Sequence, residues 1–325
     1  MLIRHFLTVD DLQPEEILAV LDLADDLKAQ RPQPGTATAT AFGGRPGDGP
    51  AGGPLAGQSI ALLFEKPSLR TRISFEVGVR ELGGHPLVLS GYQVGMNGRE
   101  PLADIARVLS RYVHAIVLRT FGQDRLDGLA EAGSIPVVNA LSDLEHPCQA
   151  IADLQTIREY KGGLDGVKLA YVGDGNNMAH SLMKAGAMTG MHVAVATPPG
   201  YEPSAQITDE ALELCIAGDG QITVTTDPAV AVADADVLYT DVWTSMGQED
   251  QAAERAGVFA PYQLNAAALD LARDDAILMH CLPAHRDEEI TEEVLEGDAS
   301  VVFAQAENRL HAQKAILVTL LGHGR

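Results

Sequence analysis

The stretch Ser59-Ile-Ala-Leu-Leu-Phe64, followed by the turn Glu65-Lys-Pro-Ser68 and a helical pattern from Leu69 to Leu82, indicates the fold class. The apolar run has the length typical of a buried strand, and Gly83-Gly84 ends the helical pattern. A buried strand joined directly to a helix is the repeating unit of α/β proteins.

The same alternation recurs along most of the chain. Strands separated by helices predict parallel sheets that are covered by helices on both faces. Besides Ser59 to Phe64, the expected strands are His85 to Leu89, Ala115 to Leu118, Ile135 to Asn139, Val167 to Val172, His192 to Ala196, Ile222 to Thr225, Val237 to Tyr239, Ile277 to Met279 and Ser300 to Phe303.

This number of strands exceeds one small sheet, so we expect two doubly wound α/β domains joined by interdomain helices. The first comprises residues 1–147 and 308–325, and the second residues 148–307. Residues 32–54 are rich in glycine and proline and predict a loop insertion without chemistry. Helical patterns lie at Pro14 to Gln30, at His146 to Tyr160 as a connection, and at Glu307 to Leu321 as a return to the first domain.

Composition limits the functional class. The chain has 325 residues, 46% of them hydrophobic, with 45 acidic and 23 basic side chains and a formal net charge of -22, which makes nucleic acid an unexpected partner. No apolar run is long enough to span a bilayer, and Met1 to Asp10 lacks a secretory signal pattern, so we expect a cytoplasmic protein. Cys148, Cys215 and Cys281 are far apart, which predicts reduced thiols rather than disulfides or a zinc site.

Ligands of open α/β sheets bind beyond the carboxyl ends of the strands, so the strand-to-helix junctions are the candidate sites. At the first junction, Ser68 is a suitable N-cap, and Arg70 and Thr71 follow within the first helical turn. Helix N-termini and guanidinium groups both favour anions, so this junction predicts a phosphate site. Arg119 follows another expected strand and can reach the same anion, although a surface salt bridge explains Arg119 alone equally well.

Two further junctions carry polar groups. His146 and Gln149 are spaced to share one helix face, where they can hold a small carbonyl and its NH2 group, although a structural histidine fits equally well. Val172-Gly-Asp-Gly-Asn-Asn-Met178 resembles part of a dinucleotide fingerprint, but Met178 stands in place of the third glycine. We therefore expect no nicotinamide cofactor.

The last junctions are Asp241-Val-Trp-Thr-Ser-Met-Gly247 and His280-Cys-Leu-Pro-Ala-His-Arg286. The Asp241 carboxylate can bind an amine, and Ser245 offers polar contacts for a carboxylate. Cys281 places a thiol at a strand end, although a buried cysteine that acts only as a small hydrophobe is the commoner case. The bond between Leu282 and Pro283 is a candidate for a cis peptide.

Together these segments resemble the carbamoyltransferase family, and most closely its ornithine branch. Ser68 to Arg72 is similar to the family's carbamoyl phosphate signature, with Leu69 in place of the common threonine, and His146 to Gln149 is similar to its carbamoyl-binding element. The Asp241 to Gly247 and His280 to Pro283 segments resemble those of the ornithine branch.

The resemblance implies the roles of individual residues. It assigns carbamoyl phosphate to Ser68, Leu69, Arg70, Thr71, Gln93, Arg119, His146, Gln149, Cys281, Leu282 and Arg309, and ornithine to Asn177, Asp241, Ser245 and Met246. It implies catalytic roles for Arg70, His146, Asp241 and Cys281, no metal or other cofactor, and a homotrimer in which the Gln93 loop is shared between subunits. Carbamoyl transfer to another amine, such as putrescine, an acylated ornithine or aspartate, and a non-catalytic module that binds a phosphorylated metabolite remain the alternatives.

Overall fold

The structure is a computed structural model that describes residues 4–31, 53–96 and 98–322. Chain contacts divide it into two compact units, Met1–Ala152 with Asn308–Arg325, and Asp153–Glu307. The expected loop insertion at 32–54 lies outside the described residues, except for its last two positions. Within the described ranges, no helix is long and apolar enough to cross a membrane.

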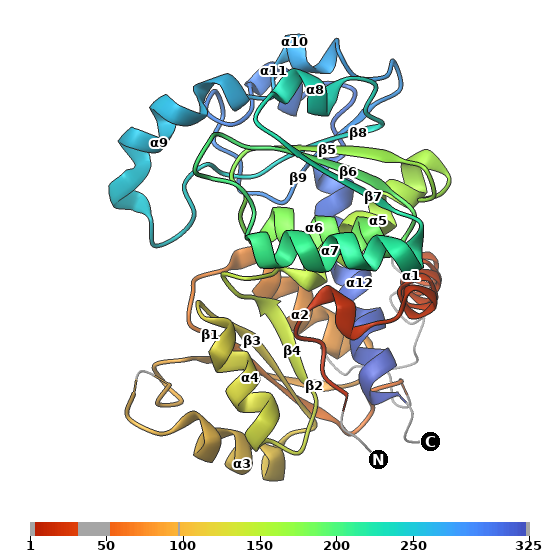
Figure 1. The fold of residues 1–325 in the computed structure, drawn as a ribbon. Helices are drawn as coiled ribbons and strands as arrows, with labels where there is room; N and C mark the ends of the chain where they lie inside the picture. The colour runs from red at the N-terminus through yellow and green to blue at the C-terminus, as the bar shows by residue number, and fades with distance from the viewer. Residues whose placement is uncertain (1–3, 32–52, 97, 323–325) are drawn as a thin grey trace. The chain divides into compact units, whose positions relative to one another are not determined.

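The first unit is built around a parallel sheet of four strands in the order β2-β1-β3-β4 (Figure 1). Its strands are β1 (Ser59–Phe64), β2 (His85–Ser90), β3 (Ala115–Arg119) and β4 (Val137–Leu141), and its helices include α1 (Pro14–Ala29), α2 (Leu69–Glu81), α3 (Leu102–Tyr112) and α4 (Gln123–Ala132). Side chains of α3 and α4 pack on one face of the sheet, where Ile105 and Leu126 lie in one cluster with Leu63 and Leu118. The central strands β1 and β3 are mostly apolar and buried because both faces of a parallel sheet are covered, whereas the edge strand β2 is partly exposed.

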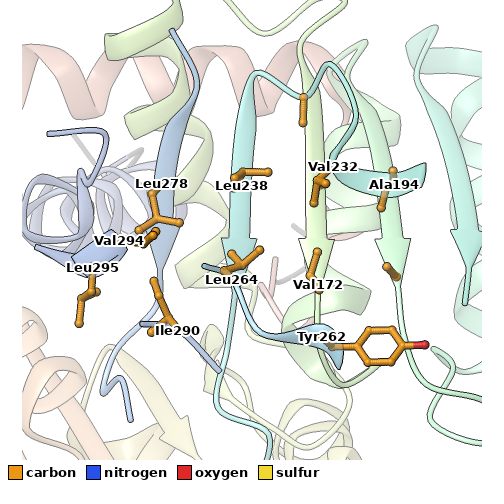
Figure 2. Close-up of a cluster of buried hydrophobic side chains, with 14 of the residues drawn as sticks. Val172, Ala194, Val232, Leu238, Tyr262, Leu264, Leu278, Ile290, Val294 and Leu295 are labelled. Carbon is orange, nitrogen blue, oxygen red and sulfur yellow. The ribbon is translucent and has the colours of Figure 1, made fainter. Parts of the chain in front are cut away.

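The second unit has a parallel sheet of five strands in the order β7-β6-β5-β8-β9. Figure 2 shows the cluster on one face, where Val172, Leu238 and Leu278 from three strands meet Val232 and Val294 from two short helices. The strands are β5 (Lys168–Val172), β6 (His192–Ala196), β7 (Gln221–Thr225), β8 (Val237–Thr240) and β9 (Ile277–His280). The helices within this unit are α6 (Asn177–Met188), α7 (Ala205–Gly218), α8 (Pro228–Val232), α9 (Ala252–Phe259), α10 (Ala266–Leu269) and α11 (Glu292–Leu295).

Two helices have residues in both units. Helix α5 (Pro147–Lys161) begins in the first unit and ends in the second, whereas α12 (Val302–Leu321) begins in the second and ends in the first. Three 3-10 turns, η1 (Val9–Asp11), η2 (Glu249–Gln251) and η3 (Ala260–Tyr262), complete the described elements. The expected fold class, two parallel sheets flanked by helices, is confirmed.

One expected strand is wrong. At Ser300 to Phe303 the structure has a single bridge from Ser300 to Leu278, and α12 begins at Val302. The backbone of Leu278 donates to Ala299 O at 2.8 Å and accepts from Val301 N at 3.0 Å, after which the chain turns into the helix. Val301 and Val302 are buried where the helix begins. A short apolar run is equally typical of a buried helix start and of a buried strand, so the sequence could not distinguish the two. The expected cis peptide between Leu282 and Pro283 is confirmed.

Candidate active site

Each sheet has one point where the strand order reverses. In the first unit the reversal lies between β1 and β3, and in the second between β5 and β8. Connections on either side of such a point leave a crevice beyond the carboxyl ends of the strands, where open α/β sheets bind ligands. Ser68 follows β1 and Arg119 ends β3, while Asn176 follows β5 and Asp241 follows β8. The sequence therefore places polar side chains at both reversal points.

In the first unit, Thr71 is the centre of a cluster of cationic side chains. Ser68 caps α2 by accepting a hydrogen bond from Thr71 N at 3.3 Å. The buried Thr71 hydroxyl accepts hydrogen bonds from Arg309 Nη2 at 2.7 Å and from Arg119 Nη1 at 3.5 Å. Two buried guanidinium groups beside the N-terminus of α2 make a strongly positive pocket, which favours an anion of small size.

Lys66 adds to this positive environment but is held by partners of its own. Its ammonium group lies 2.5 Å from Asp143 Oδ1 and 4.2 Å from the centroid of the Phe121 ring. These contacts join the turn after β1 to the segments that follow β3 and β4. Lys66 therefore stabilises the wall of the pocket, a role that the sequence did not suggest.

His146 lies directly before α5 in the same unit and is buried. Burial, and then the charges of Arg309, Arg119 and Lys66, hold its pKa well below the usual value of 6.5. The imidazole is therefore neutral near pH 7, which suits a hydrogen bond to an uncharged carbonyl or amide. Gln149, also buried, lies on the first turn of α5, and its backbone N–H donates to His146 O at 3.0 Å.

Three other expected positions of the first unit differ in their surroundings. Arg70 is partly buried in the first turn of α2, whereas the neighbouring Leu69 is 72% exposed. Gln93 is also exposed, and its side-chain oxygen accepts hydrogen bonds from Ser90 N at 2.8 Å and from Ser90 Oγ at 3.1 Å. In the single chain, Gln93 is thus turned back toward the end of β2.

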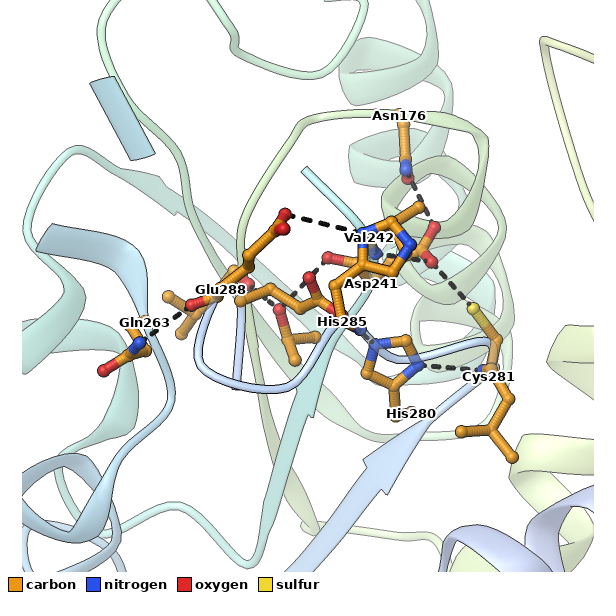
Figure 3. A network of polar contacts seen from close by, with 12 residues as sticks. Asn176, Asp241, Val242, Gln263, His280, Cys281, His285 and Glu288 are labelled. Atoms are coloured by element: carbon orange, nitrogen blue, oxygen red, sulfur yellow. Dashed lines mark hydrogen bonds and ion pairs between the residues drawn. The ribbon is translucent and has the colours of Figure 1, made fainter. Parts of the chain in front are cut away.

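In the second unit, Asp241 and Cys281 are brought into contact (Figure 3). The Cys281 thiol donates to Asp241 Oδ1 at 3.0 Å, and Val242 N donates to the same oxygen at 2.8 Å. The other carboxylate oxygen, Oδ2, accepts a hydrogen bond from Asn176 Nδ2 at 2.9 Å. The carboxylate is oriented through both of its oxygens.

The segment Cys281-Leu282 is held by His280 and Glu289. Leu282 N donates to His280 Nδ1 at 2.8 Å, so the proton of the neutral ring lies on Nε2, which contacts Glu289 Oε1 at 3.1 Å. Glu289 Oε1 also accepts from His285 N at 2.6 Å. Leu282 has a φ of +57°, a left-handed conformation that is strained for leucine.

The remaining expected residues of the second unit lie on two segments near Asp241. Asn177 begins α6 and is partly buried, while Ser245 and Met246 lie on the segment that follows β8. Ser245 N donates to Gln248 Oε1 at 3.3 Å, and the Met246 side chain is exposed. This segment is anchored by Arg255 of α9, whose Nη1 donates to Trp243 O and to Asp174 Oδ2, both at 2.8 Å.

Among the described residues, two groups of side chains bring possible metal ligands within 4.8 Å of one another. They are Asp241, His280 and Cys281, and His285, Glu288 and Glu289. In the first group the candidate ligand atoms already take part in the hydrogen bonds described above. The second group is largely exposed.

Sequence reasoning missed Asn176, Arg255 and Glu289. Asn176 directly precedes a predicted helix and has a residue type common at N-caps, so capping rules could have identified it. Arg255 and Glu289 carry no comparable local signal. Arg255 pairs with Asp174, which is distant in the sequence, and Glu289 pairs with His280 through a contact that only the fold defines. Of the residues expected at the carbamoyl end, Cys281 and Leu282 belong to the second unit and the others to the first.

The fold and these two sites define a class of two-unit α/β proteins, in which one unit offers a cationic cluster suited to an anion and the other a carboxylate beside a thiol. Comparison with known proteins agrees in both halves of the chain. Residues 4–159 match the carbamoyl-phosphate-binding domain of aspartate/ornithine carbamoyltransferases, and residues 165–320 match the aspartate/ornithine-binding domain of the same family. The chain belongs to the aspartate/ornithine carbamoyltransferase family.

Individual relatives cover nearly the whole chain. Ornithine carbamoyltransferase of Acidothermus cellulolyticus is 56% identical over 320 residues, which cover 98% of this chain and 97% of that protein. The solved structure of ornithine carbamoyltransferase from Pyrococcus furiosus has a TM-score of 0.90 and 46% identity, covering 99% of this chain and 98% of that chain. The solved structure of ornithine carbamoyltransferase from Thermus thermophilus has a TM-score of 0.84 and 43% identity. The match covers 99% of this chain and 100% of that chain.

Proposed function

We propose that this enzyme transfers the carbamoyl group of carbamoyl phosphate to the δ-amine of L-ornithine, giving L-citrulline and phosphate. The observation on which the proposal depends most is the 56% identity to ornithine carbamoyltransferase across 98% of the chain. The contact between Asp241 and Cys281 supports it, because this pair joins the two segments that resemble the ornithine branch.

Carbamoyl phosphate is assigned mainly to the first unit. We propose that Ser68, Arg70, Thr71 and Arg119 bind the phosphate, where guanidinium groups and helix N–H groups stabilise its charge as it leaves. Leu69 contributes through the backbone of the same turn. His146, Gln149 and Arg309, with the backbone of Cys281 and Leu282, are proposed to bind the carbamoyl end. A neutral His146 favours this role, since it adds no further charge to the pocket.

Ornithine is assigned to the second unit, to Asn177, Asp241, Ser245 and Met246. A free alkyl amine has a pKa of about 10.4, so ornithine arrives with a protonated δ-amine that cannot attack. Asp241 is proposed to accept the proton, and Cys281, which donates to the same carboxylate, can relay it. The amine nitrogen then forms a bond to the carbamoyl carbon and gives a tetrahedral intermediate. The bond from that carbon to the phosphate oxygen breaks, and the second proton that the nitrogen loses passes to the departing phosphate. Arg70 and His146 stabilise the charge that develops.

A colorimetric citrulline assay tests this function. Purified enzyme should produce citrulline from carbamoyl phosphate and L-ornithine, and should turn over putrescine, N-acetylornithine and aspartate at rates lower by orders of magnitude. A preference for another amine would support a different carbamoyltransferase. Binding of carbamoyl phosphate without turnover of any amine would support a non-catalytic module instead.

We also propose that the enzyme is a homotrimer in which Gln93 enters the site of a neighbouring subunit. Tyr92, next to Gln93, is 78% exposed, and Leu69 and Ile73 expose apolar surface on α2. Light scattering should give three times the chain mass. Mixed oligomers of Gln93→Ala and Arg70→Ala chains test the sharing, because a hybrid can combine an intact Arg70 site with an intact Gln93 from its neighbour. Activity that does not recover on mixing would contradict a shared site.

We propose a cytoplasmic location. The cysteines Cys148, Cys215 and Cys281 are free thiols, which suits a reducing compartment. Fractionation of the source cells should recover the citrulline-forming activity with cytosolic markers.

A further inference from the structure

We infer that Asn176 is a positioning residue, which orients the Asp241 carboxylate for the ornithine amine. The inference rests on the proposed function, in which Asp241 receives the proton of that amine. Asn176 follows β5 and precedes α6, so it lies across the reversal point of the second sheet from Asp241, which follows β8. Its side chain connects the two strand ends on either side of this point.

The contacts of Asn176 fix the orientation of its amide. The side-chain oxygen accepts hydrogen bonds from Met178 N at 2.9 Å and Ala179 N at 3.4 Å, and it is 3.1 Å from the Tyr171 hydroxyl. Backbone N–H groups can only donate, so the oxygen must face α6. The amide NH2 group must then face Asp241 Oδ2, which it contacts at 2.9 Å. The alternative flipped amide would set donor against donor at the helix and acceptor against acceptor at Asp241.

This bond completes the orientation of the carboxylate. Asp241 Oδ1 is held by Val242 N and by the Cys281 thiol, and a carboxylate fixed at one oxygen can still turn about its side-chain bonds. The Asn176 bond to Oδ2 removes that freedom and defines the plane of the group. A fixed plane matters because proton transfer depends on the direction of the accepting lone pair.

The backbone around Asn176 is held closely as well. A Cβ atom on Gly175 would lie 2.2 Å from Pro203 N, so the turn before Asn176 packs directly against the 201–203 backbone. The N-cap bonds fix the other side of the residue at the start of α6. Asn176 therefore has a rigid base from which to hold Asp241, and its helix-capping and orienting roles use different atoms of one amide.

Because the two roles use different atoms, a substitution can separate them. Serine is a good N-cap but is too short to replace the donor to Asp241, so Asn176→Ser keeps the cap and removes the orienting bond. We expect the variant to melt close to the wild-type temperature. Its kcat/KM for ornithine should fall about tenfold to a hundredfold, the usual weight of a hydrogen bond to a charged group. The Kd for carbamoyl phosphate, measured by calorimetry, should not change.

Asn265→Ser is the matched control. Asn265 caps α10 of the same unit by accepting from Ala268 N at 3.2 Å, so the control makes the same exchange at a cap that takes no part in the hydrogen bonds of Asp241 described above. It should keep wild-type kinetics. An Asn176→Ser enzyme with wild-type kcat and ornithine KM would overturn the inference, as would a loss of activity that merely follows a fall in melting temperature.

The inference can fail separately from the proposed function. If wild-type enzyme forms no citrulline, the proposed function is lost, and a crystal structure of Asn176→Ser still decides the positioning role. We expect Asp241 Oδ2 to leave its wild-type position in that structure. A carboxylate that stays in place without Asn176 would refute the role, whatever the reaction is.

Discussion

The buried hydroxyl group of Thr71 binds two cationic side chains at once. It accepts hydrogen bonds from Arg119, at the end of β3, and from Arg309, on α12, while its backbone N–H is capped by Ser68. Two cations that would otherwise repel each other are thereby held on one side of a helix N-terminus. The positive charges of this arrangement favour a bound anion.

Removal of the neighbouring Arg70 tests the use of this pocket. Arg70→Ala should lower kcat/KM for carbamoyl phosphate by an amount equal to about 2 to 4 kcal/mol of transition-state stabilisation, because a charge-assisted contact to the leaving phosphate is lost. Steady-state kinetics measures the effect. Arg80→Ala on the same helix is the control, since Arg80 is exposed and pairs with Glu76 at 3.5 Å. Near-normal turnover in Arg70→Ala would refute the phosphate assignment.

Helix α9 anchors the segment that follows β8 through a single side chain, Arg255. Its buried Arg255 bonds to Asp174 and to the carbonyl of Trp243, and it lies over the Tyr201 ring at 5.0 Å. Burial raises the pKa of Asp174, and the Arg255 charge opposes that rise. Loss of Arg255 would therefore leave a buried acid without its cation and free the segment that carries Ser245 and Met246.

We expect Arg255→Met to lower the free energy of unfolding by about 3 to 5 kcal/mol, the usual effect of removing one partner of a buried ion pair. The KM for ornithine should rise, while the Kd for carbamoyl phosphate should stay the same. Urea unfolding and kinetics measure the two effects. Arg273→Met is the control, because Arg273 is half exposed and its pair with Asp236 should contribute no more than about 1 kcal/mol. Equal effects of the two substitutions would contradict the argument.

Helix α12 carries a histidine that makes the fold sensitive to acid. Burial, and then the charges of Lys314, Lys28 and Arg31, lower the pKa of His311 to about 3. Between pH 6.5 and pH 3 the unfolded chain binds a proton at this position and the folded chain does not. The neutral His311 side chain thus makes its full contribution to the free energy of unfolding above pH 6.5. This contribution decreases as the pH falls from 6.5 to 3.

His311→Gln tests this contribution. From pH 6.5 to pH 5.5 the wild-type enzyme should lose about 1 kcal/mol more free energy of unfolding than the variant. Denaturant unfolding at the two pH values measures the difference. Parallel losses in the two proteins would mean that His311 does not contribute to acid sensitivity.

Most of the elements could be predicted from sequence because a strand of a covered parallel sheet is apolar along most of its length, as in Ser59–Phe64 and His192–Ala196. The junction residues Ser68, Arg119 and Asp241 could be located for a related reason, since ligands bind beyond strand ends. The contacts themselves could not be predicted. Arg309 is 238 residues from Thr71, and only the fold brings the two together. Asn176 caps α6 and Asn177 is the first residue of that helix, a difference that composition does not reveal.

At the scale of the whole molecule, charge is the dominant feature. The formal net charge of -22 means that acidic side chains repel one another over much of the surface. Salt shortens the range of that repulsion from about 10 Å at 0.1 M to about 3 Å at 1 M. The charges lie closer together in the folded protein than in the unfolded chain, so screening should stabilise the folded state more than the unfolded state.

We therefore expect the melting temperature to rise between 0.05 M and 1 M salt, an interval chosen to span the screening range. Calorimetry in NaCl and in KCl measures the rise, and the two salts should act alike because screening depends on ionic strength. A flat response would show that the acidic surface does not limit stability.

The chain passes between the two units twice, through α5 and through α12, so the first unit is assembled from both ends of the sequence. During synthesis on the ribosome, β1 to β4 emerge early, but Arg309 emerges only after the whole second unit. A nascent chain can form the entire second unit before the anion pocket is finished. A chain whose synthesis stops before α12 would therefore lack Arg309 and would have no enzyme activity. Formation of α12 is the event that completes the anion pocket.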